Sequence, residues 1–165
     1  MLHPAIAHFA ISLPIISLVL GFLYLFKPSE IMSKISTRFL VFGALFVIAA
    51  YFTGKEEAKE VFNTLSPDGK ADLVQHAKLG LYLAIGMGLT AAMKMFGCFK
   101  KMFKVELSAV VILLVLTGAI FFQGKLGGEL TFEHGAHVAK YVDGQKCLKE
   151  AAEMADDDED EDEDE

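Results

Sequence analysis

The chain has 165 residues, of which 53% are hydrophobic, and its mean hydropathy is positive although the sequence ends in a run of acids. This composition excludes an ordinary soluble domain and predicts an integral membrane protein. Ten of the 22 acidic residues lie at positions 156–165, which leaves 12 acidic residues against 15 basic ones. The formal net charge of −7 therefore describes the end of the chain, and the rest is mildly basic.

Apolar length predicts four membrane-spanning helices, because a bilayer core about 30 Å thick needs about 20 helical residues. The predicted spans cover residues 4–26, 39–53, 73–96 and 107–122. Pro4 suits the first turn of a helix, whereas Pro14 is expected to bend the first span. We expect an all-α, four-helix transmembrane bundle over residues 1–138, a polar segment at 139–155 and a disordered acidic tail at 156–165.

Basic residues gather in two of the predicted connections, between the first and second spans and between the third and fourth. They are Lys27, Lys34, Arg38, Lys100, Lys101 and Lys104. The positive-inside rule places both connections in the cytoplasm and both termini outside it. Lys94, near the end of the third span, is expected to extend its charge to the same cytoplasmic interface.

Under this topology all five histidines lie at the outer end of a span or in an outer segment. They are His3, His8, His76, His134 and His137. For a single histidine, an interfacial position without a ligand is the simpler interpretation. Ionisable side chains at this depth are costly, however, so the set of five favours a binding site on the outer side.

Two of these histidines are the best candidates for cofactor ligands. His8 lies inside the first span, and His76 opens the third, where small residues recur at every fourth position: Gly80, Ala84, Gly88 and Ala92. Such a stripe is typical of close helix–helix contact. A glycine one turn from a histidine also leaves flat space for a porphyrin, so we expect His8 and His76 to ligate haem b beside Gly80. His3 and His134 are expected nearby, and His134 is an alternative second ligand.

The segment from Gly127 to His137 suggests a different site. His134 and His137 are three residues apart and would share one face of a helix, and Glu129 or Glu133 could support them. With His3, these two histidines form the alternative prediction of a copper or zinc site. The pair Gly127-Gly128 is expected to make a tight turn that folds the segment over the mouth of the bundle.

Several of these motifs together resemble a known family. They are His3-Pro4 with His8-Phe9, the histidine of the third span, and Gly127-Gly128-Glu129-Leu130 followed by His134-Gly135. The chain resembles, over roughly Leu2 to Val138, the small bacterial four-helix membrane family catalogued as domain of unknown function 2231. The resemblance implies an integral membrane domain, joined in some proteins to c-type cytochrome modules, with a redox or haem-associated role. The acidic end departs from the family pattern.

The sequence gives no support for hydrolytic catalysis, since it contains no CxxC motif, no phosphate-binding glycine loop and no arrangement that suggests a catalytic triad. A bis-histidine haem needs no open coordination position, so we expect an electron carrier rather than an enzyme. The alternatives are a metal-handling protein and a non-catalytic scaffold.

The expected location is the bacterial cytoplasmic (inner) membrane, crossed several times, with the site on the periplasmic side. The expected partners are the lipid bilayer and a periplasmic c-type cytochrome or other basic electron carrier attracted by the acidic tail. No nucleic acid is expected. The sequence leaves open whether the chain forms a homo-oligomer.

Overall fold

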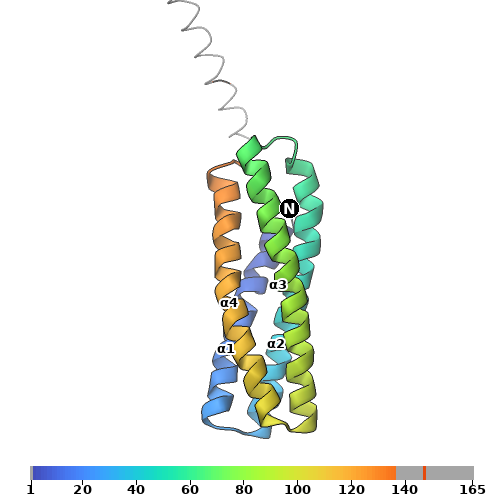
Figure 1. Cartoon of the computed structure of the whole chain (residues 1–165), viewed down its shortest axis with the longest axis vertical. Helices are drawn as coiled ribbons and strands as arrows, with labels where there is room; N and C mark the ends of the chain where they lie inside the picture. Colours follow the sequence, from blue (N-terminus) through green and yellow to red (C-terminus); the bar gives the residue numbers. More distant parts are fainter. Residues whose placement is uncertain (1, 137–146, 148–165) are drawn as a thin grey trace, which may run out of the picture.

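The computed structural model of the chain describes residues 2–136 and 147. Four helices follow one another: α1 (His3–Phe26), α2 (Glu30–Val61), α3 (Pro67–Lys100) and α4 (Phe103–Phe132). They lie side by side in one elongated bundle, and successive helices run in opposite directions (Figure 1). Each helix is long and apolar enough to cross a membrane. The predicted all-α bundle with four spans is therefore confirmed, whereas residues 156–165 and His137 lie outside the described residues.

Local sequence signals explain where the helices begin. The Ser29 hydroxyl accepts a hydrogen bond from Met32 N, and the Ser66 hydroxyl accepts one from Gly69 N, both at 3.2 Å. Each serine thereby satisfies an amide of the first turn that has no partner within its own helix. Pro67 follows Ser66 at the first helical position, where its missing amide hydrogen has no cost. Short connections then force neighbouring helices to run antiparallel.

Each helix packs against two neighbours, and the order around the bundle is α1, α2, α3, α4. The central core consists of buried apolar side chains from all four helices: Ala10, Leu40, Ala44, Val47, Leu83, Ala84, Met87, Ala91, Leu113 and Ile120. Large apolar side chains such as Phe9, Leu89 and Val115 remain exposed on the outer faces. In a bilayer these faces contact lipid, which explains why the bundle has apolar residues on both its inside and its outside.

The two ends of the bundle differ. At one end, which we call the cavity end, lie the start of α1, the α2–α3 connection and the end of α4; at the other, the closed end, lie the α1–α2 and α3–α4 connections (Figure 1). With 24 residues α1 is the shortest helix, and it begins below the level that the other three reach.

Two local expectations were wrong. Gly127 and Gly128 lie inside α4 and make no turn, because the helix continues to bury Leu126 and Leu130; the left-handed turn comes later, at Gly135, where φ is 65°. Lys94 does not extend to the interface, since it is 1% exposed and paired with Glu106 inside the bundle. The helices also continue beyond the predicted spans, and α2 runs through its charged stretch to Val61.

Candidate functional site: a histidine-lined cavity

A cavity of about 520 Å³ lies at the cavity end, and all four helices line it. Its volume is in the range of small-molecule and cofactor sites. Most of the wall is small or apolar, with glycines on three helices: Gly54, Gly80, Gly124 and Gly127. The polar side chains that line it include His3, His8, His76, Gln123 and Tyr51. Three of the five histidines in the sequence are thus gathered around one space.

His3, the first residue of α1, sits in a cradle formed by one turn of α2. The Glu57 carboxylate accepts hydrogen bonds from Leu2 N at 2.6 Å and from His3 N at 3.0 Å. It satisfies amides that α1 does not cap with a side chain of its own. Gly54 provides the room for the imidazole, because a Cβ there would lie 2.9 Å from His3 Cε1. The start of α1 is therefore held by α2.

The hydrogen-bond partners of His3 and His8 indicate which ring nitrogen carries the proton. His8 Nδ1 lies 2.6 Å from the Pro4 carbonyl oxygen, which only accepts, so Nδ1 must donate. His3 Nδ1 lies 3.4 Å from the Thr53 hydroxyl, whose own hydrogen is directed at the Ala49 carbonyl at 2.9 Å. An imidazole that carries its single proton on Nδ1 has its lone pair on Nε2. This is the usual arrangement of a metal-binding histidine.

His76 of α3 is half-buried, and its Nδ1 is fully buried with no hydrogen-bond partner in the part of the chain described. Gln123 of α4 donates from Nε2 to the His76 carbonyl at 3.0 Å, while its Oε1 is also buried and unpaired among the described residues. Gly127 leaves room for the ring, since a Cβ there would lie 3.2 Å from His76 Cε1. Buried polar atoms without partners are costly, so two of them in one cavity wall indicate a ligand or ordered water.

The imidazoles of His3 and His76 lie edge to face in the wall of the cavity. Their ring centres are 6.5 Å apart and their planes are nearly perpendicular, at 87°. An ion bonded to one nitrogen of each ring at about 2 Å would hold those nitrogens about 4 Å apart. Ring centres at the observed distance permit this separation. The sequence predicted His8 as the partner of His76; the structure brings His3 into ring contact with His76 and places His8, which is exposed, on the wall of the same cavity.

His134 lies in the segment after α4 and does not line this cavity. Its Nε2 is 2.8 Å from Asp72 Oδ2, and its ring packs against Gly69, where a Cβ would lie 3.0 Å from His134 Cγ. This contact fastens the segment to the first turns of α3, and Ala136 closes part of the cavity wall. Within the described residues no group of three or more His, Cys, Asp or Glu side chains could hold a metal ion. His137, the third member of the alternative copper or zinc site, lies outside them.

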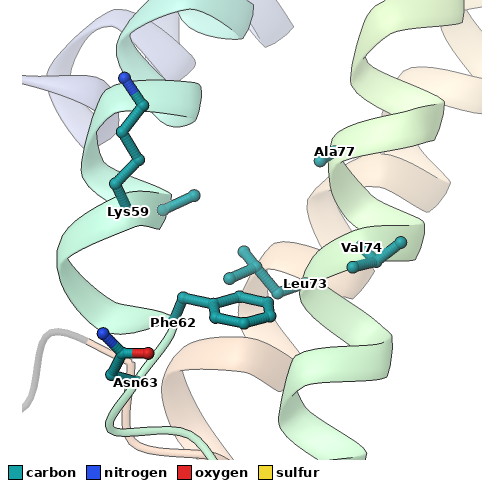
Figure 2. Close-up of a pocket in the computed structure, with 7 residues that line it drawn as sticks. Lys59, Phe62, Asn63, Leu73, Val74 and Ala77 are labelled. Atoms are coloured by element: carbon teal, nitrogen blue, oxygen red, sulfur yellow. The ribbon is translucent and has the colours of Figure 1, made fainter.

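A second, shallower pocket of about 370 Å³ lies between α2 and α3, next to the cavity. The ring of Phe62, the residue that follows α2, projects toward Leu73 of α3, whereas Lys59 extends along α2 and away from that ring (Figure 2). Lys59 pairs with Glu56 at 2.8 Å. The pocket contains no imidazole, so it is the weaker candidate for a cofactor site.

Sequence reasoning missed three contributors to the cavity: Gln123, the Glu57 carboxylate, and the close approach of Gly127 to His76. Gln123 had a detectable signal, because it is an isolated polar residue that directly follows the apolar run Leu107–Phe122. Glu57 had none, since it stands in a stretch of mixed charges that looks solvated. The role of Gly127 depends on the rotation of α4 against α3, which no local pattern specifies.

Comparison with known proteins gives one match. The family described as predicted membrane protein (DUF2231) matches residues 1–140. No curated protein and no solved structure matches the chain.

Proposed function

We propose that this chain, which belongs to the DUF2231 family of predicted membrane proteins, is a membrane electron carrier that binds one haem b in the histidine-lined cavity. His76 and His3 are the proposed axial ligands. A haem held by two histidines has no open position for a substrate, and its chemistry is one-electron transfer. The site is proposed to face the periplasm of a bacterium, as the positive-inside rule predicts.

The observation that carries this proposal is the buried, unpaired Nδ1 of His76 in a ring that faces His3 at 6.5 Å. A neutral imidazole is the ligating form, and it is also the form that costs least in an apolar cavity. The volume of about 520 Å³ and the glycines in its wall leave space beside the imidazoles. The protein would orient the ligands through Glu57 and Gln123 and would exclude water with its apolar wall.

Three single variants test which histidines bind the iron. We expect His76→Ala and His3→Ala each to abolish the low-spin haem spectrum of protein produced with ample haem, because each removes an axial ligand. His8→Ala is expected to keep that spectrum. Loss of the spectrum in His76→Ala and His8→Ala, with retention in His3→Ala, would instead support the pair predicted from the sequence.

A copper or zinc ion between His3 and His76 is the second candidate, and the facing imidazoles are the observation that favours it. Structural zinc usually has four protein ligands and catalytic zinc three, whereas this pair provides two. Metal analysis of the purified protein distinguishes the candidates: iron with a haem spectrum supports the first, and copper or zinc without iron supports the second.

A further inference from the structure

A second buried polar cluster lies toward the closed end, away from the cavity. It contains the charged pair Lys94 of α3 and Glu106 of α4, each 1% exposed. Lys94 Nζ donates to Glu106 Oε2. Both residues belong to helices that can cross the membrane, where ionisable side chains are costly and often functional. Their role therefore requires an explanation separate from that of the histidines.

Glu106 receives one hydrogen bond from each of the other three helices. The Tyr24 hydroxyl of α1 donates to Oε1 at 2.9 Å, the Ser33 hydroxyl of α2 donates to Oε2 at 2.7 Å, and Lys94 of α3 supplies the third. Lys94 Nζ also lies over the Tyr24 ring, 4.6 Å from its centre. Three donors, one of them an ammonium group, therefore satisfy the buried carboxyl oxygens of Glu106.

Close packing surrounds this cluster. A Cβ at Gly97 would lie 2.9 Å from Glu106 Cγ and 3.1 Å from Glu106 N, so only glycine lets α3 and α4 approach this closely without displacement. Just beyond, Met102 N donates to the Gly97 carbonyl at 2.8 Å and closes the connection between the two helices. Neither of the two pockets includes a residue of the cluster. The side chains thus bind one another rather than facing an open space.

We propose that Lys94 and Glu106 form a permanent charge clamp that fixes all four helices together at the closed end, so that the bundle opens only at the cavity end. Removing either partner would leave an uncompensated charge in a medium of low dielectric constant. A second ion pair at the same end provides a matched contrast: Lys101 Nζ and Glu30 Oε2 are 3.3 Å apart and both side chains are exposed. Such a surface pair contributes little.

Cys98 allows local opening of the clamp to be measured. It is half-buried and lies one helical turn beyond Lys94 in α3. The other cysteine, Cys147, is exposed and is replaced by serine in every sample. The rate at which a thiol reagent alkylates Cys98 in detergent-purified full-length protein then reports how often this end opens.

We expect Lys94→Met and Glu106→Gln each to accelerate alkylation of Cys98 by about tenfold or more, because each leaves one buried charge unpaired. The double variant, which contains neither charge, is expected to react more slowly than either single variant. In the Lys101→Met variant, Cys98 should be alkylated at the same rate as in protein that retains both Lys94 and Glu106. The clamp would be overturned if the single variants react no faster than Lys101→Met. It would also be overturned if the acceleration in the double variant equals the product of the two single effects.

If the single variants do not accumulate but the double variant is recovered in the membrane, the clamp is supported. If the single variants accumulate and the double variant does not, the clamp is overturned. If none of the three accumulates, Tyr24→Phe and Ser33→Ala remain, since each removes one hydrogen bond to Glu106 and keeps the ion pair. Each should accelerate alkylation of Cys98 more than Lys101→Met does, and equal rates would overturn the clamp. None of these measurements depends on a haem.

Discussion

His76 combines a ring packed closely against α4 with a buried nitrogen that has no partner among the described residues. Gln123 binds the His76 carbonyl, and Gly127 of α4 lies directly against the ring. A satisfied core histidine would have paired its nitrogen with one of these neighbours. The unpaired nitrogen therefore distinguishes His76 from His134, whose Nε2 is bound to Asp72.

The adjacent glycines of α4 allow a matched test of the room beside His76. Gly127→Ala would put a Cβ 3.2 Å from His76 Cε1, whereas a Cβ at Gly128 meets nothing within 4 Å. We expect Gly127→Ala to lower haem affinity by about tenfold or more, as changes that disturb the orientation of a ligating histidine do. Gly128→Ala should bind as the unaltered protein does. Haem titration of both variants provides the measurement, and equal affinities would show that the ring is not confined by α4.

At the scale of the elements, the start of α1 depends on α2. Glu57 acts as a cap supplied by a neighbouring helix, and the same turn of α2 holds the imidazole of His3 with Thr53 and Gly54. A helix normally takes its cap from its own sequence. Here the cap also determines the position of a proposed iron ligand, so the stability of one helix end and the geometry of the site are linked.

Glu57→Leu tests this link, with Glu56→Leu as its control. Removing the acceptor of two amides is expected to destabilise the protein by about 1 kcal/mol, as the loss of a helix cap does. Glu56 is an exposed partner of Lys59, so its replacement should have little effect. Hydrogen exchange of the first amides of α1 and thermal unfolding in detergent provide the measurements. Equal exchange in the two variants would contradict the role of Glu57.

The membrane-spanning helices could be predicted from the sequence, but the side-chain contacts between them could not. Apolar length alone was sufficient for four spans, because a bilayer imposes a minimum length on each. The state of Lys94 could not be predicted, because a lysine near the end of a span either extends to the interface or pairs inside, and the choice depends on Glu106 on the next helix. For the same reason the sequence indicated a site near His76 and Gly80 but selected His8 rather than His3 as the facing histidine.

For the whole molecule, the basic connections lie at one end of the bundle and the cavity lies at the other. The two lysine-rich connections lie together at the closed end, and the start of α1 and the end of α4 lie at the other end (Figure 1). Because the number of spans is even, the two connections at the closed end share one side of the membrane, and the start of α1 and the end of α4 share the other. The cavity therefore opens on the side opposite the basic connections.

A fusion placed after Glu165 tests the orientation of the bundle. We expect a reporter that fluoresces only in the cytoplasm to remain dark, because the positive-inside rule keeps the lysine-rich closed end in the cytoplasm. The same reporter fused within the α3–α4 connection should fluoresce. A bright signal after Glu165 would invert the bundle and place the cavity on the cytoplasmic side.

The absorption spectrum of the full-length protein, produced with ample haem and purified in detergent, tests the central proposal most directly. If His3 and His76 hold an iron porphyrin in the cavity, the protein is red, contains about one haem per chain and shows the spectrum of a low-spin, six-coordinate haem. A colourless protein that is folded, and that gains no such spectrum when haem is added, would contradict the proposal.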